Sequence, residues 1–210
     1  MQIYRHIPNT GLHPPCVLTI GNYDGIHLGH QKLINELLIN SKDSQMESAI
    51  MIFEPHPREF FTPKDAPTRI TSLREKIEYF QFKKIDRVYI VKFNIKFAHM
   101  SGNQFLLKLK NQISAKSILV GEDFRFGKNR ECGISDLLES DIKIIILKEI
   151  KNNKKRVSST HVRDALSSGD LDLANDLLGR YYSISGKVIH GDQRGRVMGF
   201  PTANIHMFHN

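Results

Sequence analysis

The chain has 210 residues, of which 40% are hydrophobic and 25% charged, and its formal net charge is +8. No apolar run approaches the roughly 20 residues that span a membrane, and residues 1–10 lack the apolar core of a secretory signal. The only cysteines, Cys16 and Cys132, form no C-x-x-C pair, so neither a zinc site nor a disulfide framework is expected. These features predict a cytoplasmic protein with one good-sized domain, or one domain and a fragment, and no membrane partner.

Short apolar runs alternate with helical patterns along the first 180 residues. The runs at 16–21, 48–53, 87–91, 117–120 and 142–147 are predicted strands. Apolar spacing predicts helices over 29–39, 72–82, 102–112, 159–167 and 171–178. Continuously apolar strands separated by helices are typical of a parallel sheet covered on both faces. The predicted fold class is therefore α/β, with a doubly wound parallel sheet.

The pattern changes after Gly179. Residues 181–189 alternate like an antiparallel strand, and a glycine-rich stretch over 191–199 leads to P-T-A-N. The remaining segment is too short to close a barrel with its own core. We expect one domain over 1–180, and over 181–210 the start of a β-type domain that is incomplete or leans on the first.

The segment 21–30 reads G-N-Y-D-G-I-H-L-G-H and lies where the first strand ends and the first helix begins. Ligands bind at such strand ends in doubly wound sheets, and a helix N-terminus attracts phosphate. His27 and His30 share one helical face and can hold phosphate oxygens as phosphorus is attacked. Histidines without a ligand are one alternative. A zinc pair is a weaker one, because helical pairs usually have i, i+4 spacing.

A second glycine-containing segment, residues 121–129, is similar to a Walker loop. It has one residue too many between its glycines, and Asn129 stands where Ser or Thr is needed. No other P-loop is present in the sequence, so a P-loop kinase is disfavoured.

H-x-G-H at a first strand end is the signature of the adenylyl-transferring nucleotidyltransferases. Four further segments narrow the resemblance: F-E-P-H-P at 53–57, V-G-E-D-F-R-F-G at 120–127, V-S-S-T-H-V-R at 157–163, and the segment from G-K-V-I-H-G to P-T-A-N at 186–204. In this order they strongly resemble the bacterial bifunctional riboflavin kinase/FAD synthetases. The resemblance implies a Rossmann-like nucleotidyltransferase fold.

The resemblance also implies roles for individual residues. His27 and His30 are expected to stabilise the transition state at the α-phosphorus of ATP. The expected ATP-binding residues are Gly21, Asn22, Tyr23, Gly25, Gly29, Asp123, Ser159, Thr160 and Arg163. The expected flavin-binding residues are Asp24, Phe53, Pro55, His56, Pro57, Phe124 and Arg125. Three alternatives stay open: helix capping for 158–160, core packing for Phe124, and a purely structural turn at 53–57.

The C-terminal segment resembles the opening of the riboflavin kinase domain. There, Thr202 and Asn204 are implied to coordinate Mg²⁺ with ATP phosphates, and their hard oxygen atoms suit this ion. The family's catalytic glutamate lies beyond the position of Asn210. We therefore expect this chain not to phosphorylate riboflavin.

The predicted reaction is FMN + ATP → FAD + pyrophosphate, with Mg²⁺ neutralising the triphosphate. One alternative is an H-x-G-H enzyme acting on a nicotinate or pantetheine phosphate, which P-T-A-N disfavours. Another is a non-catalytic flavin- or nucleotide-binding fragment. The charge alone suggests a nucleic-acid binder, but no aromatics interleave with the basic run at 148–156. We expect small-molecule substrates, no nucleic acid and no obligate protein partner.

Overall fold

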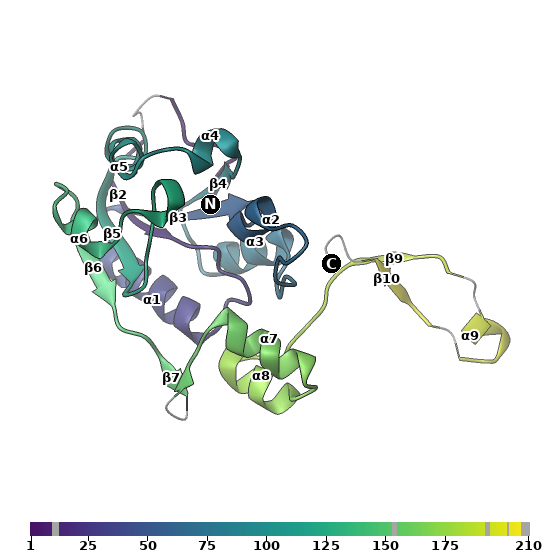
Figure 1. Ribbon diagram of the computed structural model, residues 1–210. Helices are drawn as coiled ribbons and strands as arrows, with labels where there is room; N and C mark the ends of the chain where they lie inside the picture. The colour runs from purple at the N-terminus through teal and green to yellow at the C-terminus, as the bar shows by residue number, and fades with distance from the viewer. Residues whose placement is uncertain (10–12, 153–154, 192–193, 201, 207–210) are drawn as a thin grey trace.

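The centre of the molecule is a six-stranded sheet, seen in a computed structural model that describes residues 1–9, 13–152, 155–191, 194–200 and 202–206 (Figure 1). Its strands are β1 (Gln2–Tyr4), β2 (Cys16–Ile20), β3 (Glu47–Glu54), β4 (Arg87–Lys92), β5 (Ala115–Gly121) and β6 (Lys143–Leu147). They lie in the order β1-β4-β3-β2-β5-β6, and each neighbouring pair is parallel. The predicted parallel sheet is confirmed.

The strand order reverses direction at β2. The chain passes from β2 to β3 and β4 on one side, then returns to place β5 and β6 on the other. All five residues of β2 are buried, as expected for a strand covered on both faces. The crevice outside the carboxyl end of such a central strand is the usual ligand position in this fold class.

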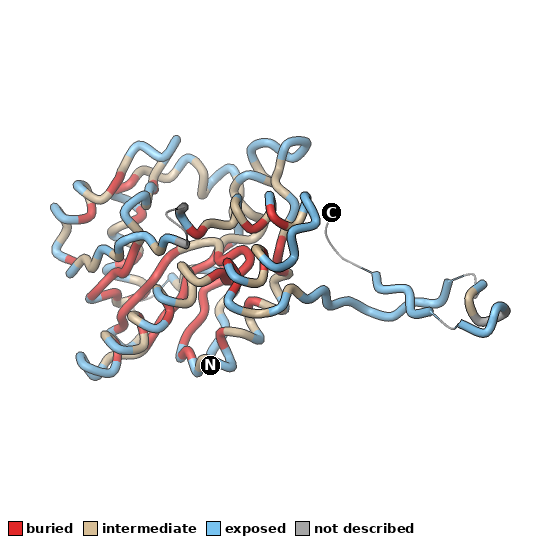
Figure 2. Tube along the Cα trace, turned by 90° about the horizontal axis from the view of Figure 1, so that it is seen from below, coloured by how far each residue is buried: buried red, intermediate tan, exposed pale blue. Residues whose placement is uncertain are grey.

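Helices cover both faces of the sheet. On one face α1 (Leu28–Asp43) and α3 (Leu73–Phe82) bury Ile34, Leu37 and Phe80 against the strands. On the other face α5 (Gly102–Asn111) and α6 (Ile134–Leu138) bury Phe105, Leu109 and Leu137. Each such side chain contributes about 1.5–3 kcal/mol by leaving water. Figure 2 shows the buried strands between these partly exposed helices, so the doubly wound class is confirmed.

A third apolar cluster joins a helix pair, α7 (Ser159–Ser167) and α8 (Leu171–Leu178), to the start of α1. Val162 and Leu177 are fully buried in it, and Leu28 of α1 packs against it. α8 ends at Gly179 in the left-handed conformation, with φ of 66°. A Cβ atom there would lie 2.5 Å from Leu28 Cδ2, so glycine permits the close docking of α8 on α1.

Shorter elements connect these layers. They are α2 (Pro57–Phe61), α4 (Ile95–Ala98), a 3₁₀ turn (Lys128–Arg130), and the paired strands β7 (Lys151–Asn152) and β8 (Lys155–Arg156). Among the described residues, no helix is both long and apolar enough to cross a bilayer.

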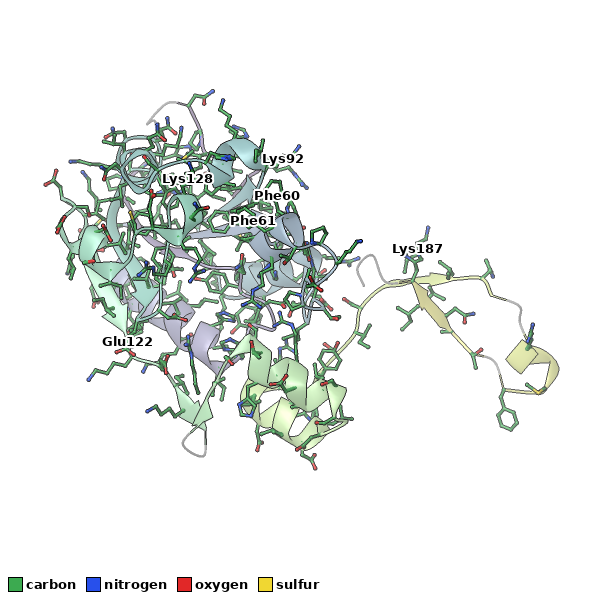
Figure 3. All side chains as sticks on the ribbon, in the orientation of Figure 1. Phe60, Phe61, Lys92, Glu122, Lys128 and Lys187 are labelled. Carbon is green, nitrogen blue, oxygen red and sulfur yellow. The ribbon has the colours of Figure 1, made fainter. Side chains whose placement is uncertain are left out.

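Beyond Arg180 the chain forms an extended arm (Figures 1 and 3). It contains β9 (Lys187–Ile189), α9 (Arg194–Val197) and β10 (Asn204–His206), and β9 pairs with β10 in antiparallel fashion. The strand predicted over 181–189 is wrong in its first part, because 181–186 pair with no strand among the described residues. All residues of β9 and β10 are exposed, so the arm has no core of its own in the part that the structure describes.

Candidate active site

The loop between β2 and α1 is tightly held at the carboxyl edge of the sheet. Gly25 has φ of 84° and donates its N–H to Thr71 Oγ1 at 2.8 Å. Tyr23 and Ile26 also have positive φ, at 51° and 45°. Such backbone strain costs on the order of 1–3 kcal/mol per residue and persists only when the surroundings enforce it. Here both side chains are buried in the core, which fixes the path of the loop.

The histidines of H-x-G-H form a stacked pair. His27 is the N-cap of α1, and its Nδ1 accepts a hydrogen bond from the backbone N–H of His30 at 3.4 Å. The two rings lie 3.7 Å apart between centroids and 20° from coplanar. The predicted proximity of the two imidazoles is therefore present, at the N-terminus of a helix of 16 residues.

Both imidazoles are neutral at pH 7. Burial lowers the pKa of His27 to about 4, aided by the positive charges of Arg156 and Arg163. Burial also holds the pKa of His30 well below its ordinary value, with further contributions from His27 and Lys76. His27 Nδ1 accepts a hydrogen bond, so its single proton lies on Nε2. Each ring can thus donate one hydrogen bond to a phosphate oxygen without adding a charge.

Two buried polar atoms of this segment have no partner among the described residues. They are His30 Nδ1 and Asn22 Oδ1. A buried polar atom without a partner costs about 1–3 kcal/mol, and most buried polar atoms in folded proteins have one. Their presence is consistent with a ligand that completes the site.

Asp24 connects the loop to two distant segments. Its carboxylate accepts hydrogen bonds from the N–H groups of Ile70 and Thr71, both at 3.0 Å, and forms an ion pair with Arg163. Its backbone carbonyl accepts the hydroxyl of Ser159 at 2.9 Å. Asp24 is only 4% exposed. These contacts give Asp24 a structural role, and the expected part of this residue in flavin binding stays a prediction.

The start of α7 faces this loop. Ser158 caps the helix by accepting the N–H of His161, so the capping interpretation applies to that serine. Thr160 is exposed. The Arg163 guanidinium also donates to the Thr68 carbonyl at 2.7 Å. The expected phosphate-binding residues of α7 thus lie beside the histidine loop, with Arg163 held by Asp24.

Tyr23 lies beneath the site rather than in it. The residue is fully buried, its hydroxyl is hydrogen-bonded to Thr19 at 2.8 Å, and its ring packs on His30 and Phe80. The expected contact of Tyr23 with ATP stays a prediction for this residue, whose ring is enclosed in the core. A Cβ on Gly21 would lie 3.2 Å from the Tyr23 ring, and one on Gly29 would lie 3.1 Å from the His27 ring. These glycines leave room for the two rings.

The turn after β3 brings one more histidine to the site. His56 caps α2. Its Nδ1 accepts a hydrogen bond from the backbone N–H of Arg58 at 3.1 Å, and its backbone N–H donates to the carboxylate of Glu59. The turn contains a cis peptide bond before Pro55, and Pro57 is the first residue of α2. Burial lowers the pKa of His56, and the charges of Asp24, Lys76, Glu59 and Arg163 act on it too. Phe53, in contrast, packs on Phe93 and Phe97.

The segment after β5 is less closely joined to the histidines. Asp123 pairs with Arg156 at 2.6 Å, and Phe124 stacks on the buried Phe126. Arg125 donates to the backbone carbonyls of Arg130 and Glu131. The side chain of Phe124 thus packs against the core on one side and is partly exposed on the other.

Thr202 and Asn204 are not brought together with the other predicted residues. Both are exposed on the arm, which Figure 1 shows extending away from the domain. Sequence reasoning missed two cations whose charges act on the histidines, Lys76 on His30 and His56, and Arg156 on His27. Their only signal in the sequence is positive charge, which is typical of any exposed helix or loop.

Comparison with known proteins identifies the family. Residues 10–161 match the FAD synthetase family. The chain belongs to the FAD synthetase family. Residues 178–210 match the riboflavin kinase family, so the second resemblance seen in the arm is supported as well.

Curated relatives of this FAD synthetase family member are named for two activities, riboflavin kinase and FMN adenylyltransferase. The chain is 40% identical to a protein of Buchnera aphidicola subsp. Schizaphis graminum named bifunctional riboflavin kinase/FMN adenylyltransferase, covering 100% of this chain and 70% of that protein. Proteins with the same name from Haemophilus influenzae and Escherichia coli K12 are 39% and 40% identical. This chain covers 69% and 68% of their lengths, so it is shorter than these relatives.

Solved structures agree on the fold. A crystal structure from Streptococcus pneumoniae, titled macrolide-efflux protein, matches this chain with a TM-score of 0.81 and 26% sequence identity. The match covers 99% of this chain and 69% of the Streptococcus pneumoniae chain. Pantoate-beta-alanine ligase from Francisella tularensis has a TM-score of 0.50 and 18% identity, covering 85% of this chain and 78% of its own. The second likeness shows the fold alone.

Proposed function

We propose that this site transfers the AMP group of ATP to the phosphate of FMN, which forms FAD and pyrophosphate. The observation that carries the proposal is the stacked, neutral His27–His30 pair at the N-terminus of α1, outside the central strand of the sheet. Membership of the FAD synthetase family and the name FMN adenylyltransferase of the relatives give the substrates.

The chemistry needs no nucleophile from the protein. An oxygen of the FMN phosphate attacks the α-phosphorus of ATP, and the bond from that phosphorus to the β-phosphate oxygen breaks. The attacking oxygen is already deprotonated at pH 7, so no proton has to be removed. The N–H groups of His27 and His30 stabilise charge on the α-phosphate oxygens, and positioning supplies the rest.

The residues at the start of α7 are proposed to hold the departing pyrophosphate. Thr160 offers an exposed hydroxyl, and Arg163 offers a guanidinium that now binds Asp24. A guanidinium binds phosphate in two-point fashion, so the triphosphate competes with Asp24 for Arg163. Asp123 and the turn at 53–57 remain the proposed neighbours of adenosine and flavin.

We propose that Mg²⁺ arrives bound to ATP. The described residues contain no group of three or more His, Cys, Asp or Glu side chains that could hold a metal ion. The oxygen atoms of Thr202 and Asn204 suit Mg²⁺ chemically, and we keep them as proposed ligands of the kinase segment. When bound, Mg²⁺ supplies charge neutralisation to the triphosphate.

We also propose a cytoplasmic location. Cys16 and Cys132 are free thiols, which suits a reducing compartment. Small molecules are the proposed partners, without nucleic acid or an obligate protein.

The test is chromatographic assay of FMN, FAD and riboflavin after incubation of the purified chain with Mg-ATP. FAD is expected to form from FMN, and His27→Ala and His30→Ala are each expected to lower kcat by about 10²–10³, as loss of a transition-state donor does. His6→Ala, an exposed histidine outside the site, is the control. Wild-type turnover in both site variants would contradict the assignment. Parallel reactions with a nicotinate or pantetheine phosphate in place of FMN identify any other acceptor.

A further inference from the structure

Lys76 of α3 is a largely buried cation that is not paired directly with a carboxylate among the described residues. The residue is 5% exposed, and neither a hydrogen bond nor an ion pair of its ammonium is found in the part of the chain that the structure describes. Taking a charge out of water costs several kcal/mol unless a partner replaces the water. Lysine is almost never fully buried without one, so the position demands an explanation.

The acidic groups around Lys76 are already engaged. Asp24, Glu54 and Glu59 all act on its charge, but each is paired directly with an arginine. Asp24 binds Arg163, while Glu54 and Glu59 both bind the Arg69 guanidinium at 2.5 Å.

The helix that carries Lys76 is held against the histidine loop on both sides of this residue. Gly25 donates to Thr71 Oγ1 just before α3, and Phe80, which shares the buried face of α3 with Lys76, packs on Tyr23 beneath His30.

The charge of Lys76 acts on His30, beside the N-terminus of α1, and on His56, in the turn after β3. His30 belongs to the phosphate side and His56 to the proposed flavin side. A cation beside both groups is placed to bind the phosphate of FMN as it approaches the triphosphate of ATP.

We propose that the Lys76 ammonium binds the phosphate of FMN and holds it for attack on the α-phosphorus of ATP. This inference rests on the proposed function and adds a residue to it. The phosphate dianion supplies the missing counter-charge, and the ammonium donates hydrogen bonds to phosphate oxygens other than the attacking one. Riboflavin lacks the phosphate, so Lys76 also makes the site select FMN over riboflavin.

The test compares wild type, Lys76→Met and Arg74→Met in the full chain. Arg74 is an exposed cation on the same helix, so its variant is the matched control. We expect kcat/KM for FMN to fall at least tenfold in Lys76→Met and to stay within twofold of wild type in Arg74→Met. The ratio of the dissociation constants of riboflavin and FMN, measured by flavin fluorescence, should fall in Lys76→Met only.

Thermal unfolding without substrate separates this role from a structural one. Methionine removes a buried charge and keeps the volume, so Lys76→Met should unfold at or above the wild-type temperature. Wild-type kcat/KM in Lys76→Met would overturn the inference, as would a loss of activity that accompanies a lower unfolding temperature.

A failure of the proposed function is distinguishable. If neither wild type nor Arg74→Met forms FAD, the reaction is wrong, and the inference is then judged by phosphate binding alone. FMN should still raise the unfolding temperature of wild type and Arg74→Met but not of Lys76→Met. Equal shifts in all three would overturn the role of Lys76.

Discussion

His27 and His30 are uncharged in the folded protein, and this lowers the free energy of unfolding at low pH. An unfolded chain binds a proton at His27 below its ordinary pKa of 6.5, whereas the folded chain resists protonation down to about 4. Between these values the unfolded state holds more protons, so the free energy of unfolding falls as pH falls from 6.5 towards 4. Acid sensitivity is thus built into the site.

We expect His27→Asn to reduce this acid sensitivity. Asparagine is also a good N-cap, so the helix start is kept while the titrating group is removed. Going from pH 7 to pH 5, wild type should lose roughly 2 kcal/mol more stability than the variant, since each pKa unit corresponds to about 1.4 kcal/mol. Urea unfolding at the two pH values measures the difference, with His6→Asn as the exposed control. Equal losses in wild type and His27→Asn would refute the neutral-histidine account.

The residue scale also shows where sequence reasoning stops. The pairing of His27 with His30 follows from helical spacing and was predicted. The burial of the Tyr23 ring could not be, because an aromatic in a glycine-rich loop is equally suited to packing and to ligand contact. The burial of Lys76 could not be predicted for a similar reason. A lysine on an amphipathic helix predicts an exposed position, whereas this residue is only 5% exposed.

Among the elements, Asp24 is the junction between the β2–α1 loop, the segment before α3, and α7. One carboxylate receives two backbone N–H groups and the Arg163 guanidinium. Asp24 and Arg163, which are 139 positions apart in the sequence, are therefore joined through this one carboxylate.

We expect Asp24→Asn to destabilise the fold by about 3 kcal/mol, because it leaves Arg163 and a backbone donor without their anionic partner. Asp65→Asn, on an exposed loop, should change the free energy of unfolding by less than about 0.5 kcal/mol. Urea unfolding of both variants provides the comparison. A difference below about 1 kcal/mol between them would contradict the junction role.

The elements themselves were mostly readable from the sequence. β2 to β6, α1, α3, α5, α7 and α8 each overlap a predicted segment, because long apolar runs and helical spacing report burial directly. β1 and the short helices α2, α4 and α6 were missed, since three to five residues carry too little pattern. The strand expected over 181–186 fails because alternation reports only a capacity to pair, and these residues find no partner strand in the described structure.

The whole molecule consists of a folded domain and an arm that adds little to its core. Tyr182 packs on the α7–α8 cluster and Ser185 bonds to Glu75, but every side chain after Gly186 that the structure describes is exposed. The division near residue 180 stays a prediction, and these two contacts carry the first domain's packing a few residues beyond it.

We expect a chain shortened to residues 1–186 to unfold at the same temperature as the full chain, within about 2 °C, and to make FAD at the same rate. The reason is that no buried apolar surface is lost. Differential scanning calorimetry and the chromatographic assay check the two expectations. Loss of cooperative unfolding, or of FAD formation, would show that the arm belongs to the first domain. A version shortened to residues 1–170, which removes α8 and its buried Leu177, should fail to fold and serves as the reference.

The docking of α8 on α1 has a consequence for how the protein is made. Gln31 Nε2 donates to the Leu178 carbonyl at 2.7 Å, and Arg180 donates to the Gly25 carbonyl at 3.0 Å. We therefore expect the histidine loop of a nascent chain to gain its last contacts only when these late residues leave the ribosome, although the central strand and first helix are synthesised long before. Until then Leu28 lacks the α8 surface on which it packs, so we expect a chain that stops before α8 to expose this side chain to chaperones and proteases.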